Sequence, residues 1–139
     1  MLLLNPRTVR FGSATWDNIA AAVIDRAPHK TTEDWSDTGP YATLADVPEQ
    51  RVRITITQEL ARDDIGSPRP GEQATLTLYT SPALADAGRK KVSCTAVILA
   101  VLHELSLKKG AVRTIQLAAI SADGAADPIT ITDASDGSL

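Results

Sequence analysis

Alternation of apolar and polar residues is the strongest pattern in the chain, and it is clearest in RVRITITQEL, from Arg51 to Leu60. Successive side chains of an extended strand point to opposite faces, so this segment is predicted to be a strand with one apolar and one polar face. The apolar face consists of Val52, Ile54, Ile56 and Leu60. The polar face consists of Arg51, Arg53, Thr55, Thr57 and Glu59.

The same alternation returns in ATLTLYT, residues 74–80, and in PITIT, residues 128–132. Repeated alternation predicts a sheet that buries one face and shows the other to water. Thr75 and Thr77 belong to the polar face of the first of these segments.

Further strands are predicted at residues 8–11, and at residues 16–28, where the apolar positions keep no helical stripe over more than two turns. Residues 92–107 and 111–121 are predicted to form a hairpin around Lys108-Lys109-Gly110, with the first strand inside the sheet. A helix over residues 96–107 is the alternative, but the β-branched residues of that segment favour a strand.

One short helix is predicted at residues 82–88. Ser81 is placed to cap it, Pro82 occupies the first helical position and Gly88 lies just beyond the end.

Two long connections contain the residues that we expect to contact other molecules. Residues 29–50 have no sustained period and are predicted to be a loop that is functional, is ordered by a partner or hides a short helix. Trp35 and Tyr41 lie in this segment, and they either bury area in an interface or fold back on their own domain. The other connection is a protruding hairpin loop at residues 61–72. Its contact candidates are Asp63, Asp64 and Arg69.

The 139 residues fit one domain, 1–139, with residues 1–7 as an N-terminal arm and residues 133–139 as a loose C-terminal tail. Aromatic residues make up only 4%, so the core is expected to be aliphatic, which suits packed sheets.

The net charge of −3 argues against a surface that neutralises phosphates. The apolar start is too short for a signal peptide, and residues 94–102 are too short for a membrane span. We expect a soluble protein made inside a cell.

No group of residues points to catalysis, a metal or a cofactor. His29 and His103 form no pair at metal-ligand spacing, and Cys94, expected in the core, completes no zinc site with His103. The sequence contains neither a Gly-x-Ser-x-Gly elbow nor a phosphate-binding glycine loop. Carboxylate pairs such as Glu33 with Asp34 lie where nothing desolvates them. We therefore expect a protein that is not an enzyme.

The order of these elements and three segments resemble the tail tube proteins of long-tailed bacteriophages and contractile injection systems. The segments are TVRFGSATWDNI (residues 8–19), EDWSDTGPYATLADVPEQRVRITITQEL (residues 33–60) and AVRTIQLAAISADGAADPITI (residues 111–131). The resemblance covers residues 8–132 and is a pattern of strands and turns.

This resemblance implies a mainly β fold, a two-sheet β-sandwich with one short helix and long loops. It implies that six copies form a ring, that rings stack into a tube, and that the inner sheets join into one barrel around a lumen for DNA. It also implies a long loop that reaches the adjacent ring, for which residues 31–50 and 62–72 are the candidates. The polar faces, with Arg51, Arg53, Thr55, Thr57, Thr75 and Thr77, would line the lumen or the outer wall.

The expected partners are further copies of the chain and other tail proteins, such as sheath, baseplate or terminator. DNA would pass through without specific binding. The expected location is the tail of the virion, after assembly in the cytoplasm of the host bacterium. A tail terminator, adaptor or baseplate ring protein is the alternative within the same class. A monomeric β-sandwich that binds sugar or peptide through Trp35 and Tyr41 is the alternative from another class.

Overall fold

All the regular structure in the described part of the chain is β-strand. The computed structural model describes residues 2–4, 8–60, 68–80, 88–106 and 110–133. The strands are β1 (Leu2–Leu4), β2 (Val9–Phe11), β3 (Ala14–Trp16), β4 (Ile19–Trp35), β5 (Ala42–Leu60), β6 (Gln73–Tyr79), β7 (Lys90–Ser106), β8 (Gly110–Ile120) and β9 (Thr130–Asp133). The predicted mainly β class is confirmed.

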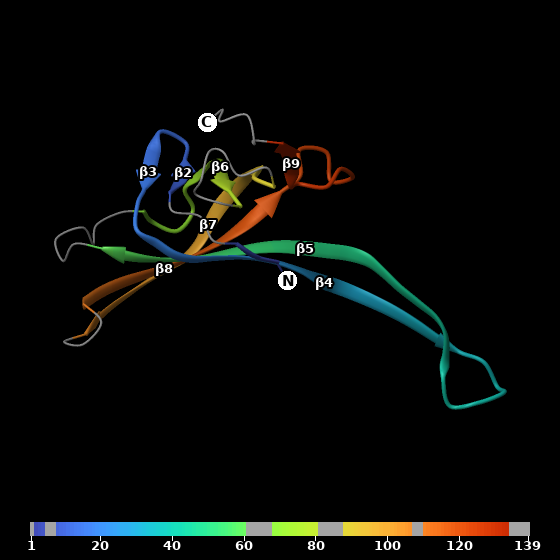
Figure 1. Cartoon of the computed structure of the whole chain (residues 1–139). Helices are drawn as coiled ribbons and strands as arrows, with labels where there is room; N and C mark the ends of the chain where they lie inside the picture. The colour runs from blue at the N-terminus through green and yellow to red at the C-terminus, as the bar shows by residue number, and fades with distance from the viewer. Residues whose placement is uncertain (1, 5–7, 61–67, 81–87, 107–109, 134–139) are drawn as a thin grey trace.

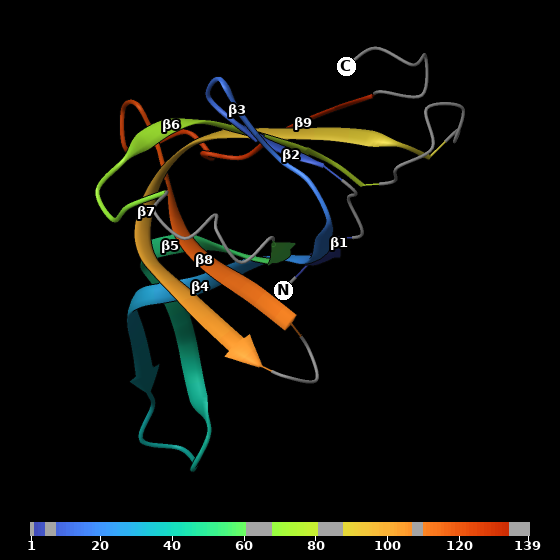
Figure 2. The ribbon, with the colours of Figure 1, turned by 90° about the vertical axis from the view of Figure 1, so that its left-hand side faces the viewer.

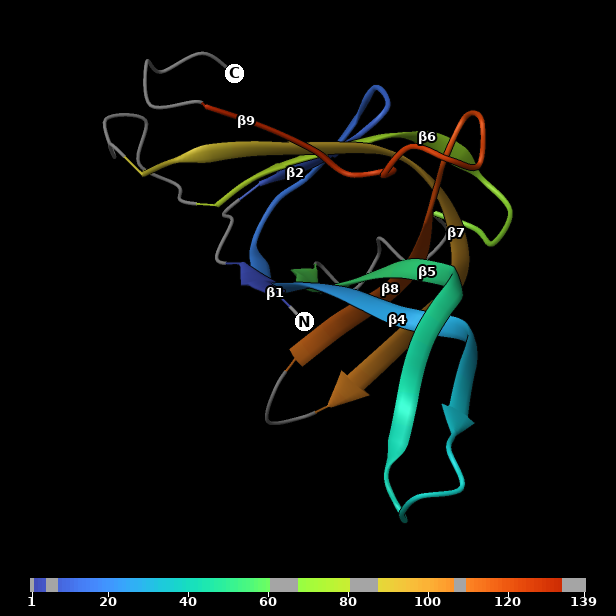
Figure 3. The same cartoon turned by 90° about the vertical axis from the view of Figure 1, so that its right-hand side faces the viewer.

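These strands belong to one antiparallel sheet with the order β1-β4-β5-β8-β7-β6-β2-β3, and β9 pairs with β7. The early part of β7 pairs with β6 and β9, and the later part pairs with β8 alone. Figures 2 and 3 show that β7 curves strongly, so that the sheet folds over on itself. The expected two-sheet sandwich is therefore one continuous ladder with two facing layers.

We call the two sides of this folded sheet the β6 layer and the β5 layer. The β6 layer contains β2, β3, β6, β9 and the first part of β7, whereas the β5 layer contains β1, β4, β5, β8 and the rest of β7. The core lies between them and joins Ile54 and Ile56 of β5 with Leu76 and Leu78 of β6 in one buried cluster. The alternation of β5 and β6 is thus confirmed as the pattern of one buried face.

The largest difference from the sequence-based expectation is at residues 29–50, which are not a loop. β4 continues to Trp35 and β5 begins at Ala42, so that only residues 36–41 connect them. Prediction of a strand within residues 16–28 is confirmed, although the chain breaks at Asn18, whose φ of 57° separates β3 from β4.

The hairpin predicted around residues 108–110 is confirmed by the pairing of β7 with β8, and β7 lies inside the sheet, between β6 and β8. Residues 107–109 of its turn lie outside the described residues, as do residues 81–87, where the helix was predicted. The strand predicted at residues 128–132 is observed as β9, from Thr130 to Asp133.

The two ends of the chain are described in part. Part of the expected N-terminal arm is a strand, because Leu2–Leu4 pairs with Ala22–Ile24 of β4. Asp133, which was assigned to the loose tail, is the last residue of β9, and residues 134–139 lie outside the described residues.

Candidate assembly surfaces

The most conspicuous feature of the molecule is a two-stranded ribbon that leaves the body, formed by the end of β4 and the start of β5 (Figure 1). We call residues 28–51 the extension. Every residue in it is exposed, whereas the same two strands become buried where they enter the body, at Ile24 and Val52. The extension therefore has no core of its own.

Register shifts interrupt the pairing of the extension between Pro28 and Lys30, between Lys30 and Thr32, and next to Trp35. Pro28 has no N–H group to donate to the ladder. A register shift leaves an extra, unpaired residue in one strand, and such β-bulges bend and twist a ribbon. Figure 3 shows the two strands turning away from the layers where the extension begins.

Large apolar side chains of the extension are open to water. The exposed fraction is 57% for Trp35 and 83% for Tyr41, and Leu44 and Val47 are also exposed. The indole Nε1 of Trp35 donates a hydrogen bond to the carbonyl oxygen of Pro40 (3.2 Å), within the tip of the same hairpin. Neither ring therefore belongs to the buried core of the body.

A second group of exposed apolar residues lies on the later part of β7, a strand that the sequence analysis placed inside the sheet. A bulge between Ile98 and Ala100 shifts the register, and beyond it the described part of β7 pairs with β8 alone. Leu102 and Leu105 are 64% and 63% exposed. The long apolar run in the sequence did not indicate that these leucines are exposed, because the burial of a residue of β7 depends on whether the β6 layer extends far enough to cover it.

The predicted polar-face residues are on two different outer surfaces. Ile54 and Leu76 share one cluster between the layers, so the residues that alternate with them point away from it in opposite directions. One surface, on β5, carries Arg51, Arg53, Thr55 and Thr57. The other, on β6, carries Thr75 and Thr77.

Of the contact candidates in residues 61–72, Arg69 is described and exposed, whereas Asp63 and Asp64 lie outside the described residues. The backbone N–H of Arg69 donates to the Glu72 carboxylate (2.6 Å). The next residues are fixed to β7, since Gly71 N–H donates to the Ile98 oxygen (2.7 Å) and Ile98 N–H to the Glu72 oxygen (2.9 Å). Gly71 has a φ of 93°, which glycine adopts without strain.

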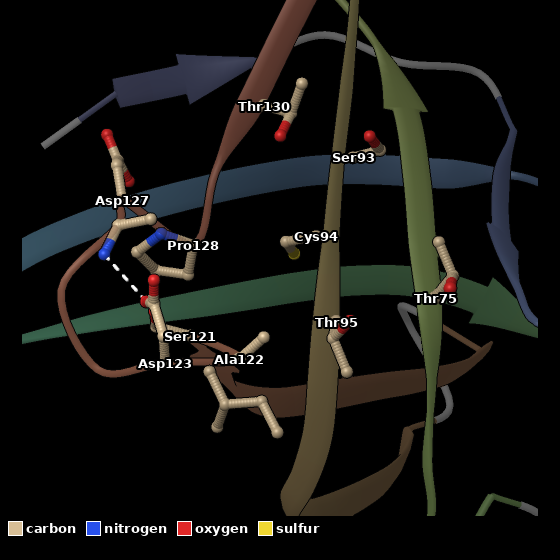
Figure 4. A pocket seen from close by; sticks show the side chains of 12 residues that line it. Thr75, Ser93, Cys94, Thr95, Ser121, Ala122, Asp123, Asp127, Pro128 and Thr130 are labelled. Atoms are coloured by element: carbon tan, nitrogen blue, oxygen red, sulfur yellow. Dashed lines mark hydrogen bonds between the residues drawn. The ribbon is translucent and has the colours of Figure 1, made fainter.

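The loop between β8 and β9 connects the two layers and borders two open cavities. One cavity of about 340 Å³ lies against β6 and β7, with Thr75, Ser93 and Thr95 facing Asp127 and Pro128 across it (Figure 4). Another of about 580 Å³ lies at the base of the extension, beside Arg26 and Arg51.

Hydrogen bonds stabilise the anionic form of both aspartates in this loop. Backbone N–H groups of Ala126 and Ala125 donate to Asp123, which lowers the pKa of its carboxyl to about 2. Arg26 of β4 donates to Asp127 at 3.0 Å, and this contact lowers the pKa of Asp127. The Arg26–Asp127 pair thereby links the loop to the base of the extension.

A buried polar group that the sequence analysis did not identify lies at one end of the core. Gln58 of β5 donates through Nε2 to the backbone oxygen of Asp17 (2.7 Å) and accepts from Arg113 of β8. The Arg113 guanidinium lies 5.7 Å from the centre of the Trp16 ring. The sequence did contain a signal of this burial. Gln58 occupies a position on the apolar face of RVRITITQEL, between Ile56 and Leu60.

The single cysteine, Cys94, is buried. Burial raises the pKa of Cys94 to about 11, which disfavours its thiolate. The residues described contain no cluster of three or more His, Cys, Asp or Glu side chains that could hold a metal ion. Among them there is also no helix with the length and apolarity needed to cross a membrane.

Comparison with solved structures finds a chain of similar fold. That chain comes from the tail of an empty GTA particle refined with C6 symmetry. The TM-score is 0.55 and the sequence identity is 14%, with 90% of this chain and 94% of that chain covered. Neither a protein-family model nor a curated protein matches the sequence. At this identity the likeness concerns the fold alone, and it extends over nearly the whole of both chains.

Proposed function

We propose that this protein is a structural component of a phage-type tail, in which six copies form a ring and rings stack into a tube. The observation that carries the proposal is the extension, whose residues are all exposed. A two-stranded ribbon alone is only marginally stable in water. Trp35 and Tyr41 are open to solvent on it, and aromatic side chains of this kind supply much of the buried area in protein interfaces.

The fold similarity supports the same proposal, because the similar chain belongs to a tail with C6 symmetry. Six copies related by a closed rotation contact each other head to tail, which removes unpaired sheet edges. Each copy would contribute its extension to a neighbour, with Trp35, Tyr41 and Arg69 as contact residues. Asp63 and Asp64 remain contact candidates from the sequence alone.

In such a tube one of the two polar surfaces would face the lumen. A chain with a net charge of −3 suits a conduit through which DNA slides, since like charge opposes binding of phosphates. The protein would act without catalysis or cofactor, in the virion tail, after assembly in the host bacterial cytoplasm. Its other partners would be tail proteins such as sheath, baseplate or terminator.

A second candidate is a terminator, adaptor or baseplate ring protein of the same machine. The same exposed extension favours it, because it would fit a different tail protein equally well. Such a protein would form single rings that do not stack.

Negative-stain electron microscopy of the purified full chain, together with sedimentation velocity, tests the proposal. Tubes built from sixfold rings are the expected result, and single rings would favour the second candidate. A protein that stays monomeric at millimolar concentration would overturn both, and would favour the monomeric sugar-binding or peptide-binding module.

A further inference from the structure

The extension is strongly acidic beyond its first three residues. Residues 31–50 contain Glu33, Asp34, Asp37, Asp46 and Glu49 and no lysine or arginine, which gives this segment a net charge of −5. The whole chain carries −3, so the remaining residues together carry +2. Lys30 and Arg51 stand at the base of the extension, so the extension as a whole carries −3 and the rest of the chain is neutral.

The charged side chains at the outward positions of the β6 layer strands, Arg10 and Lys91, are positive, and most of the neighbouring outward positions carry hydroxyl groups. These outward positions alternate with buried residues such as Val9, Leu76 and Val92. Register places Thr15, Arg10, Thr77, Ser93 and Thr130 in one row across β3, β2, β6, β7 and β9. A neighbouring row contains Tyr79, Lys91 and Thr132, and the Arg89 guanidinium lies over the Tyr79 ring, 4.0 Å from its centre.

Asp17, Asp123 and Asp127 border this face, and each is already engaged. Asp17 accepts a hydrogen bond from the Thr8 hydroxyl (3.3 Å). Asp123 accepts hydrogen bonds from the N–H groups of its own loop, and Asp127 is paired with Arg26. The face formed by Arg10, Lys91 and the surrounding hydroxyl groups is therefore available to an anionic partner that brings its own carboxylates.

The outward positions of the β5 layer have a different character, because charges of both signs alternate there. Asp25 of β4 stands directly opposite Arg53 of β5, and Glu59 lies further along the same face of β5. Glu104 of β7 shares this face, since it pairs with Val112, which pairs with Glu59. Like charges that meet across an interface cost several kcal/mol, so this face is the poorer match for the acidic extension.

We propose that the acidic extension of one copy docks on the outward face of the β6 layer of a second copy, with Arg10 and Lys91 as its counter-charges. This inference rests on the proposed function in one respect, namely that the partner is another copy of the chain. Threonine and serine hydroxyl groups of the same rows donate hydrogen bonds to carboxylates, and Trp35 and Tyr41 bring the apolar area of the contact.

A charge exchange between two full-length variants tests this contact. The first variant is Arg10→Glu with Lys91→Glu, and the second is Glu33→Lys with Asp34→Lys. Residues 33 and 34 point to opposite sides of the ribbon, so the second variant changes both sides. All four positions are at the surface or half-buried, and circular dichroism checks that each variant is folded.

Each variant alone should need at least a tenfold higher concentration than the wild type to assemble, because like charges then meet in the contact. An equimolar mixture should assemble again, since the acidic extension of the first variant fits the basic face of the second, and the lysines introduced at positions 33 and 34 of the second fit the acidic face of the first. Sedimentation velocity and negative-stain microscopy measure both effects.

The control is Arg53→Glu with Gln116→Glu, which adds negative charge to the outward face of the β5 layer and leaves the extension unchanged. The lysine variant of the extension should not restore assembly to it. The proposal is overturned if the mixture of the first two variants stays unassembled, if each variant assembles like the wild type, or if the control is restored equally well. A wild type that does not assemble would instead overturn the proposed function.

Discussion

At the scale of single residues, the core depends on positions that exclude water completely. Ile54 and Ile56 have no exposed surface and are packed against the β6 layer. Each buried aliphatic side chain of this size contributes about 1.5–3 kcal/mol by leaving water. The whole domain is expected to be stable by only about 5–15 kcal/mol, so one wrong residue at these positions decides whether it folds.

Replacement of Ile56 by aspartate is therefore expected to abolish folding, because a buried charge without a partner costs several kcal/mol. Far-UV circular dichroism and a urea titration would measure this loss. The control is Gln116→Asp, at an exposed position of β8, which should remain folded. A soluble and native-like Ile56→Asp protein would show that this face of β5 is not the buried one.

Gln58 provides a second prediction at the residue scale. The Gln58→Ala variant is expected to lose about 2–3 kcal/mol of unfolding free energy, because the buried Arg113 loses its hydrogen-bond acceptor and Asp17 loses its donor. Urea unfolding measures the change, with the exposed Gln116→Ala as the matched control. Equal stability of the two variants would contradict a structural role for the Gln58 side chain.

At the scale of elements, the sequence predicted strands where one face is buried, and it did not predict the extension. Periodicity in a sequence records burial on one side of a strand. Residues 28–51 are exposed on both sides of the ribbon, so nothing imposes an alternation there. The aromatic residues Trp35 and Tyr41 were still identified as contact candidates, because large rings in a polar segment stand out even without a period.

Trp35 carries the prediction for this element. The Trp35→Ala variant is expected to keep the folded body, because the ring lies outside the core, and to lose assembly. Truncation of a central interface tryptophan costs about 2 kcal/mol or more, which corresponds to a shift of more than tenfold in the assembling concentration. Sedimentation velocity measures the shift, and Thr32→Ala on the same ribbon is the control. Unchanged assembly would exclude Trp35 from the contact.

The loop between β8 and β9 should respond to acid. The folded-state pKa of Asp123 is lowered from 3.8 to about 2, so its contribution to stability is present above about pH 4 and is lost as the pH falls from 4 to 2. The melting temperature of the wild type should therefore exceed that of Asp123→Asn at pH 7, and the two should converge near pH 2. A difference that is the same at both pH values would show that the carboxylate does not act through its ionised form.

At the scale of the whole molecule, the extension contributes no buried residue to the core, although its two strands continue directly into the body. The cross-strand pair Lys30 and Glu49 face each other near the base of the extension. Removal of everything beyond this pair leaves all the buried residues of both layers in place.

Replacement of residues 31–48 by Asn-Gly, a pair favoured in two-residue hairpin turns, is expected to give a folded monomer. Its melting temperature should stay close to that of the wild type, because the lost residues bury no core, while rings or tubes should be absent. Differential scanning calorimetry and negative-stain microscopy check the two halves of this expectation. Normal assembly of the shortened chain would remove the extension from the proposed function.

The strands β4 and β5 pass from the body into the extension without an intervening linker. A mechanical pull on a docked tip would therefore run along the two strands into the body, where β5 is bonded to β4 on one side and to β8 on the other. Hydrogen bonds loaded along the strand direction share the force instead of opening one after another. A string of such subunits would therefore resist stretching through the backbone ladder itself.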